Sequence, residues 1–182
     1  MLVVQAMYFM LPAYIANMFP VLAKNSMKCL DRPVDCGLKL RGRPLFGSHK
    51  TIRGLLVGVL AGIIVFQVQK WLYSIGFFQS ISLVDYNEIY ASWRLLPGLL
   101  LGLGALAGDM IESFFKRQFR IKPGRSWIPF DQIDFIIGAL LLVSIVYAPS
   151  WQVILILMVL TPLIHIGANH LGYHLNLKKE KW

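Results

Sequence analysis

Two pairs of acidic residues are the strongest chemical signal in the chain: Asp109 with Glu112, and Asp131 with Asp134. The members of each pair are three residues apart, so in a helix they share one face. Carboxylates with no His or Cys partner are the ligands that Mg²⁺ prefers, together with water and phosphate oxygens. If the two segments pack side by side, the four acids converge and predict a magnesium site, with the basic residues Lys116 and Arg117 beside it.

Each acid taken alone has a simpler explanation, and these alternatives stay open. Glu112 can form an ion pair with Lys116 one helical turn later, which is worth a few tenths of a kcal/mol. Asp131 can cap the N-terminus of a helix. The convergence of four acids beside two cations is what favours a metal site.

The elements that must position these residues follow from composition. Of the 182 residues, 57% are hydrophobic and only 15% are charged, whereas soluble domains are about 45–50% apolar and about 25% charged. A helix needs about 20 apolar residues to cross a bilayer, and five stretches qualify. We predict an all-α integral membrane protein, one domain over 1–182, with five transmembrane helices at 2–23, 54–73, 95–115, 133–147 and 151–172. The first stretch has no leading basic residues, so we expect a retained span rather than a cleaved signal peptide.

Basic residues predict the orientation of these spans. Nearly all of the 18 lysines and arginines fall in the loops 24–53 and 116–132 and in the tail, which leaves Lys70 and Arg94 on the opposite side. The positive-inside rule makes the basic side cytosolic, with the N-terminus outside and the C-terminus inside. The net charge of +9 is therefore attributed to membrane orientation, and no nucleic acid partner is expected.

The first cytosolic loop contains a second candidate element. Its run 42–54 places glycines and the pair Lys50–Thr51 just before a helix, where backbone N–H groups and the helix dipole favour an anion. The spacing is not that of a Walker A loop, so alone it is a weak signal; beside a magnesium site it suggests a triphosphate clamp. His165 and Asn169, one turn apart in the last span, suit either a contact between helices or a substrate contact. Cys29 and Cys36 are expected to be free thiols.

Four segments together resemble the CDP-archaeol synthase family: 12–20, 47–54, 108–117 and 129–135, and the tail from His165 onward is similar as well. The last two segments also resemble the signature of the larger CDP-diacylglycerol synthases, through the matching residues Ser113, Lys116, Arg117, Asp131 and Asp134. The chain departs from that signature because Pro123 follows Lys122 and a His-Gly-Gly motif is missing, which fits the shorter archaeal branch better.

The resemblance implies a cytidylyltransferase in the cell membrane, multi-pass, with its active site facing the cytosol. Its substrates would be CTP and the isoprenoid ether-lipid phosphate 2,3-bis-O-geranylgeranylglycerol 1-phosphate, and its products CDP-archaeol and pyrophosphate. Mg²⁺ would be held by Asp109, Asp131 and Asp134, and these three acids with Lys116 and Arg117 would be catalytic. The nucleotide or phosphate groups would be bound by Asn17, Arg43, Gly47, Lys50, Thr51, Arg53, Glu112, Ser113, His165 and Asn169. The oligomeric state and the number of metal ions stay open.

Two other classes are less compatible with the sequence. A CDP-alcohol phosphotransferase would carry a D-G-x2-A-R motif, which is absent. A small transporter or channel subunit would be expected to carry charges at mid-membrane depth and inverted repeats, and neither is found in the sequence.

Overall fold

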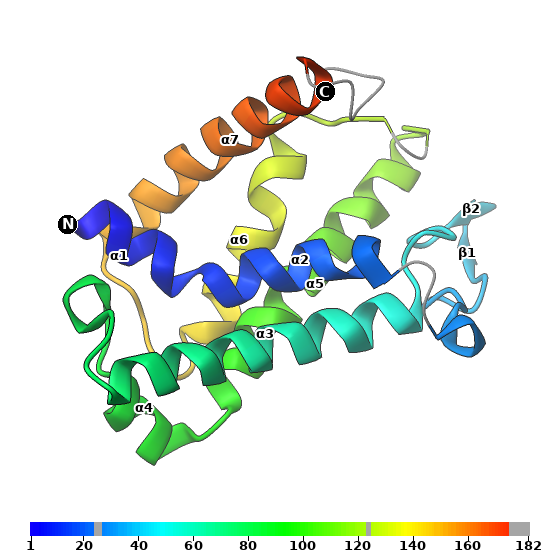
Figure 1. Ribbon diagram of the computed structural model, residues 1–182. Coiled ribbons are helices and arrows are strands. Elements are labelled where there is room, and N and C mark those ends of the chain that lie inside the picture. The colour runs from blue at the N-terminus through cyan, green and yellow to red at the C-terminus, as the bar shows by residue number, and fades with distance from the viewer. Residues whose placement is uncertain (24–26, 123–124, 175–182) are drawn as a thin grey trace.

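A computed structural model describes residues 1–23, 27–122 and 125–174, although the side chains of 168–174 are not described. This part of the chain folds into seven α-helices (Figure 1). They are α1 (Leu2–Phe9), α2 (Leu11–Leu22), α3 (Ile52–Ser74), α4 (Tyr86–Trp93), α5 (Leu96–Gln118), α6 (Phe130–Val143) and α7 (Trp151–His174). The connections contain 3-10 turns η2 (Lys28–Leu30) and η3 (Gln79–Ile81) and an antiparallel hairpin of β1 (Lys39–Leu40) and β2 (Arg43–Pro44).

The apolar helices fall at the five predicted stretches, but they do not all have the length of a membrane span. Within the described residues, α3 and α5 are each long and apolar enough to cross a bilayer, and α1 with α2 forms a third candidate if the pair counts as one bent span. The helical structure and the apolar candidate spans agree with the predicted class, whereas five spans remain a prediction.

The first predicted span is broken rather than continuous. α1 and α2 meet at Met10 with a bend of 45°. Pro12 lies in the first turn of α2, where a missing backbone N–H costs little, whereas in the middle of a continuous helix Pro12 would leave a carbonyl in the preceding turn without its hydrogen bond. The sequence Leu11-Pro12 therefore explains why the helix restarts here.

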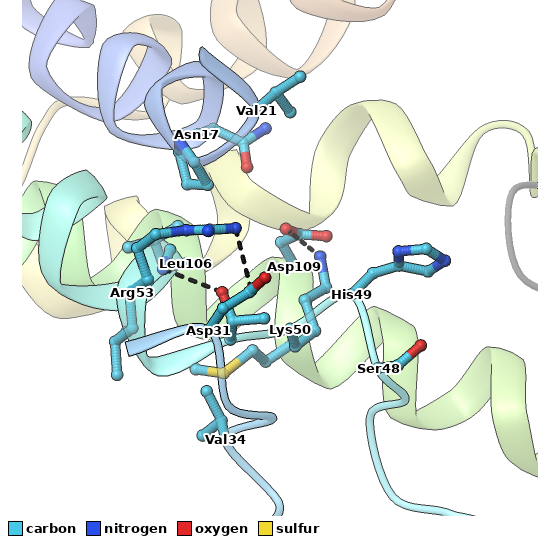
Figure 2. A pocket seen from close by; sticks show the side chains of 15 residues that line it. Asn17, Val21, Asp31, Val34, Ser48, His49, Lys50, Arg53, Leu106 and Asp109 are labelled. Atoms are coloured by element: carbon cyan, nitrogen blue, oxygen red, sulfur yellow. Dashed lines mark hydrogen bonds and ion pairs between the residues drawn. The ribbon is translucent and has the colours of Figure 1, made fainter. Parts of the chain in front are cut away.

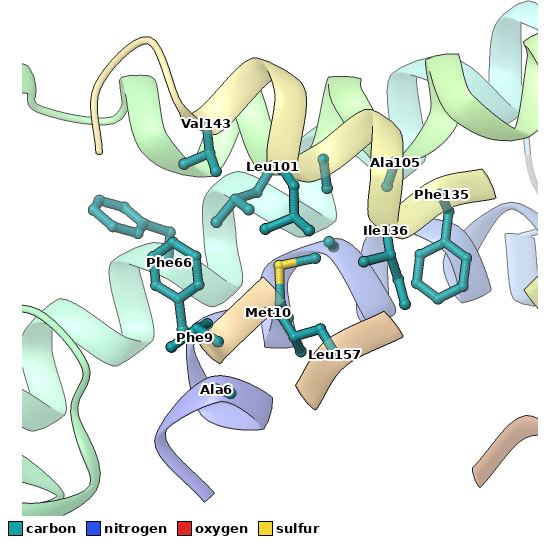
Figure 3. Packing of buried hydrophobic residues seen from close by; sticks show 14 of the residues in the cluster. Ala6, Phe9, Met10, Phe66, Leu101, Ala105, Phe135, Ile136, Val143 and Leu157 are labelled. Carbon is teal, nitrogen blue, oxygen red and sulfur yellow. The ribbon is translucent and has the colours of Figure 1, made fainter. Parts of the chain in front are cut away.

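The apolar core lies where the break in the first span meets the other helices (Figure 3). Met10 is fully buried, and Leu101 of α5, Ile136 of α6 and Leu157 of α7 pack in the same cluster with at most 1% of their surface exposed. Burial of such side chains is worth about 1.5–3 kcal/mol each. The core therefore holds α5, α6 and α7 around the broken helix.

Small residues let α5 lie between α3 and α6 at close range. A Cβ added to Gly62 of α3 would come within 2.9 Å of the Cα of Gly102, and one added to Gly104 of α5 would overlap the carbonyl of Gly138 in α6. Glycines at such contacts allow two helix backbones to approach closely. The glycines of α5 therefore allow close packing of α5 against both neighbouring helices.

A further helix, α4, lies in the connection between α3 and α5, where no element was predicted. Asp85 caps it, because its Oδ1 accepts hydrogen bonds from the backbone N–H groups of Asn87 (2.9 Å) and Glu88 (3.1 Å). Tyr86 is buried against the rings of Tyr8, Phe66 and Tyr73. Asp85 and Glu88 themselves are exposed.

Candidate active site

The two acid-bearing segments meet where α5 crosses α6. A Cβ added to Gly108 would overlap the carbonyl oxygen of Asp134, so the backbones are in direct contact at the residue before Asp109. Carboxylate oxygens of Asp109, Glu112 and Asp134 lie within 4.8 Å of one another. Three of the four acids predicted to converge therefore do so. Glu112 completes this cluster, whereas the family resemblance implied Asp131 as the third metal ligand.

Asp131 lies beside this cluster and forms an ion pair. Its Oδ1 is 2.6 Å from Nζ of Lys116, and its Oδ2 accepts a hydrogen bond from the backbone N–H of Trp127 at 2.7 Å. The N-cap of α6 is Pro129 rather than Asp131, so the capping alternative does not describe this residue. Both oxygens of Asp131 are thus engaged by groups of the protein.

Lys116 is a buried cation shared by two carboxylates. Besides Asp131 it contacts Glu112, with 3.2 Å between Nζ and Oε1, which is the i,i+4 pair that the sequence offered as an alternative. Only 9% of Lys116 is exposed, and a buried charge is tolerated only where opposite charges compensate its desolvation. The two acids therefore fix the position of this ammonium group in the site.

The first loop reaches the same acids through Lys50, whose Nζ forms an ion pair with Oδ2 of Asp109. An antiparallel bridge fixes this part of the loop: Val34 N–H donates to the carbonyl of Lys50 (2.8 Å), and Ile52 N–H donates to that of Arg32 (2.9 Å). Thr51 then caps α3, because its Oγ1 accepts a hydrogen bond from Gly54 N–H at 3.1 Å. The predicted helix start after the glycine run is therefore present, and it brings Lys50 to α5.

A side chain of the loop, Asp35, accepts hydrogen bonds from two backbone N–H groups of the glycine run that was expected to bind phosphate. Gly47 N–H donates to Oδ2 of Asp35 at 3.2 Å, and Phe46 N–H donates to the same oxygen at 3.0 Å. Gly47 has φ of +93°, a conformation that favours glycine. The N–H of Gly47 is therefore already hydrogen-bonded. If the loop binds a triphosphate at this point, the contacts come from neighbouring side chains rather than from this N–H.

Two cavities open at this site. The first, which we call the carboxylate cavity, has a volume of about 400 Å³ and is bounded by the first loop, the end of α5 and the start of α6. Its lining residues are Phe46, Gly47, Ser48, His49, Lys50, Asp109, Glu112, Ser113, Lys116, Arg117, Asp131 and Asp134. All five residues expected to be catalytic therefore line one cavity.

The second, the α2–α3 cavity, has a volume of about 420 Å³. Asn17 and Val21 of α2 face it from one side and Arg53 from another, where Arg53 pairs with Asp31 at 3.0 Å (Figure 2). Apolar side chains such as Leu106 complete its lining. Both cavities share four lining residues, namely Ser48, His49, Lys50 and Asp109. A strongly charged cavity thus adjoins one of mixed polarity.

Two residues of the predicted binding set, Arg43 and His165, line neither of these cavities, and a third, Asn169, is not tested. Nη1 of Arg43 donates a hydrogen bond to the carbonyl of Gln118, which ties the hairpin to the end of α5. His165 is exposed on α7 and lines neither cavity. The side chain of Asn169 lies outside the described residues.

Comparison with known proteins decides the family. The model of the CarS-like CDP-archaeol synthase family matches residues 1–182. The chain belongs to the CDP-archaeol synthase family. The resemblance inferred from four short segments is thereby confirmed over the full length, and the chain is assigned to a family of enzymes.

Several CDP-archaeol synthases are similar to the chain along nearly all of it. The protein of Methanospirillum hungatei is 39% identical over 181 residues, covering 95% of this chain and 100% of the relative. That of Methanopyrus kandleri is 39% identical over 182 residues, covering 98% and 92%. That of Pyrococcus furiosus is 36% identical over 181 residues, covering 99% and 98%.

A solved structure of an intramembrane enzyme for archaeal membrane lipid biosynthesis has the same fold. It superposes with a TM-score of 0.71 at 36% identity and covers 90% of this chain and 92% of its own. This chain belongs to the same family and has apolar candidate spans, so it is a membrane enzyme.

Two lining residues shared by both cavities, Ser48 and His49, were missed as site residues. They lie within the run 47–54 that suggested phosphate binding. Their position between Gly47 and Lys50 could have indicated them. When both ends of a short loop line a cavity, the residues between them lie beside that cavity as well.

Proposed function

We propose that the protein transfers CMP from CTP to 2,3-bis-O-geranylgeranylglycerol 1-phosphate, which gives CDP-archaeol and pyrophosphate. The observation that carries this proposal is the carboxylate cavity, where three clustered carboxylates face Lys50, Lys116 and Arg117. This mixture suits a polyphosphate that arrives with a divalent cation. Membership of the CDP-archaeol synthase family supports the same reaction.

The chemistry needs no covalent step on the protein. The second pKa of a phosphate monoester is about 6, so the lipid phosphate is largely dianionic near neutral pH. One of its oxygens attacks the α-phosphorus of CTP, a new P–O bond forms, and the bond to the bridging oxygen of the β-phosphate breaks. Pyrophosphate leaves with the electron pair, and no proton has to be removed from the nucleophile. The protein's task is to position two anions and to offset their repulsion.

We assign that electrostatic task to the cations of the cavity. Lys116 is held in place by Glu112 and Asp131, and Arg117 lines the cavity beside it. Fixed charges in a partly dehydrated site stabilise developing negative charge without reorganisation. Lys50, paired with Asp109 where the two cavities adjoin, is suited to contact phosphate groups of either substrate.

The clustered acids fit Mg²⁺. Their donor set is three carboxylates without nitrogen or sulfur, as this ion prefers. We propose that Asp109, Glu112 and Asp134 hold the ion, and we prefer Glu112 to Asp131 because both oxygens of Asp131 are already engaged. When bound, Mg²⁺ supplies neutralisation of the phosphate charge.

We further propose five membrane spans, with the N-terminus outside and both cavities on the cytosolic side of the cell membrane. The basic loop residues and the apolar helices support this orientation. The chain carries a natural probe, because both of its cysteines, Cys29 and Cys36, are exposed in the loop before α3. A membrane-impermeant maleimide should label inside-out vesicles and leave right-side-out vesicles unlabelled; the opposite pattern would reverse the proposed orientation.

Labelled substrate tests the reaction itself. The purified protein is incubated in detergent with Mg²⁺, the ether-lipid phosphate and CTP labelled in either the α- or the γ-phosphate. Label from the α-position should move into an organic-extractable lipid, and label from the γ-position should stay in water-soluble pyrophosphate. Absence of labelled lipid from α-labelled CTP would overturn the proposal.

A further inference from the structure

Asp35 touches neither cavity, yet its carboxylate binds one wall of the carboxylate cavity. We propose that Asp35 is a positioning residue for CTP: it holds the loop segment Phe46–Gly47 in the place where the triphosphate is bound. This inference rests on the proposed function and names a residue that the site's lining does not include.

The carboxylate of Asp35 ties together both ends of a hairpin. Its Oδ1 accepts a hydrogen bond from Gly37 N–H at 2.9 Å, and its Oδ2 accepts those of Phe46 at 3.0 Å and Gly47 at 3.2 Å. Only 6% of Asp35 is exposed. The chain between these donors forms the β1–β2 hairpin, so this one side chain closes the loop onto itself.

The groups that Asp35 holds belong to the site. Phe46 and Gly47 line the carboxylate cavity, and a Cβ added to Gly47 would lie 3.8 Å from Cδ of Arg117. Lys50 N–H donates to the carbonyl of Gly47 at 3.3 Å. A shift of Gly47 would therefore move the wall of the cavity relative to both Arg117 and Lys50.

Other contacts fix the loop on either side of Phe46 and Gly47, and Asp35 holds the segment between them. The bridge between Pro33 and Thr51 fixes the chain just before Asp35 and just after Lys50, and Arg43 fixes the hairpin to the end of α5. Between these points Phe46 and Gly47 are held by Asp35. A small displacement of a binding group can cost a large factor in binding or rate, so these two residues need their own anchor.

A carboxylate suits this role better than an amide. Both of its oxygens accept hydrogen bonds, and bonds to an ionised acceptor are roughly twice as strong as neutral ones. The side chain of Asn offers one oxygen, so its NH₂ group would face a backbone N–H at the other position. Asp35→Asn therefore weakens the anchor while it changes the side-chain volume little.

The test separates positioning from mere loop stability by means of a matched control. Asp85 also accepts two backbone N–H groups, but it caps α4 in the connection between α3 and α5. Steady-state kinetics are measured for wild type, Asp35→Asn and Asp85→Asn with CTP and the lipid phosphate varied in turn. Asp35→Asn should raise KM for CTP about tenfold, the loss expected for one charged hydrogen bond. Its KM for the lipid phosphate should stay within about twofold, and Asp85→Asn should leave both values unchanged.

A second readout reports the loop directly. Trypsin can cleave after Lys39 and Arg41 in the hairpin, and Asp35→Asn should accelerate cleavage at these bonds relative to Asp85→Asn. If Asp35→Asn does not yield folded protein, Asp35→Glu keeps the charge but displaces it by one methylene, and the same selective rise in KM for CTP is expected. A wild-type KM for CTP in the folded variant, or an equal rise in both KM values, would overturn the positioning role. If the wild-type protein formed no CDP-lipid, the proposed function would fail instead.

Discussion

Gly108 in α5 lies against the backbone of Asp134 in α6, so closely that a Cβ at Gly108 would overlap the carbonyl oxygen of Asp134. The contact brings the next residue along α5, Asp109, within reach of the Asp134 carboxylate. The separation of the two helices thus determines whether the acids can share one cation. A packing glycine is in this way part of the geometry of the proposed active site.

Gly108→Ala should lower kcat by roughly 100-fold, because a Cβ forces α5 and α6 apart and a displacement near 1 Å can cost that much. Gly167→Ala is the matched control: a Cβ there meets no atom of the described residues within 4 Å, and alanine in a helix is about 1 kcal/mol better than glycine. The control should keep wild-type activity with equal or higher thermal stability. Equal activity of both variants would contradict the proposed role of the helix contact.

The separate positions of Asp131 and Asp134 predict different defects in the two asparagine variants. Both should lose most turnover, by a factor of about 100 or more, while remaining folded in detergent. Asp134→Asn should also weaken Mn²⁺ binding, measured by electron paramagnetic resonance as a Mg²⁺ substitute, by about tenfold. Asp131→Asn should leave Mn²⁺ binding within about threefold of wild type. The reverse order of Mn²⁺ affinities would show that Asp131 is the ligand and Asp134 the positioning acid.

Lys116→Ala should impair both activity and stability. It leaves Glu112 and Asp131 without their shared cation, and removal of one partner of a buried ion pair costs about 3–5 kcal/mol. The midpoint of thermal unfolding should fall clearly, whereas Lys70→Ala, which removes a cation–π contact with Tyr90, should change it little. If Lys116→Ala keeps most activity and the wild-type unfolding midpoint, this lysine serves only to orient the protein in the membrane.

The hydrogen bonds that the Asp35 carboxylate accepts from the loop should weaken only at acidic pH, where the carboxylate becomes protonated. Burial raises the pKa of Asp35, but the N–H groups of Phe46, Gly37 and Gly47 outweigh that effect, so its pKa lies below the usual value. A lowered pKa stabilises the folded loop fully above the unfolded pKa of about 3.9, and this contribution disappears as the pH falls through the folded pKa.

Hydrogen exchange checks this pH dependence. After correction for intrinsic exchange rates, protection of the amides of Phe46 and Gly47 should stay constant from about pH 7 to about pH 4 and fall below that range. Asp35→Asn should give low protection without such a transition. A loss of protection in the wild-type protein between about pH 7 and pH 5 would contradict the assignment.

Much of this architecture is visible in the sequence, because a helix in an apolar environment needs a long uncharged stretch. The predicted range 54–73 lies within α3, and 95–115 lies within α5 except for its first residue, Leu95, which is the N-cap of that helix. The i,i+3 spacing also placed the members of each acid pair on a common face. The break at Met10 was missed although Pro12 marks it, because hydropathy alone cannot separate one continuous helix from two.

The sequence offered the Glu112–Lys116 pair, which lies within one helix, but the pairing of Lys116 with Asp131 could not be predicted. That pair depends on how α5 crosses α6, and the two backbones make close contact at Gly108. The role of Asp35 was equally hidden, because its main partners lie eleven and twelve residues away in a loop without periodicity. Contacts of this kind depend on the folded backbone rather than on local residue patterns.

The central claim, direct transfer of CMP at the carboxylate cavity, is tested most directly by ³¹P nuclear magnetic resonance of one reaction mixture. Wild-type protein with CTP, Mg²⁺ and the ether-lipid phosphate should convert the lipid monoester signal into a diphosphate diester while pyrophosphate appears in equal amount. The same mixture with Asp134→Asn should remain unchanged. Release of CDP and orthophosphate without a lipid diphosphate, or unaltered turnover by Asp134→Asn, would contradict the account.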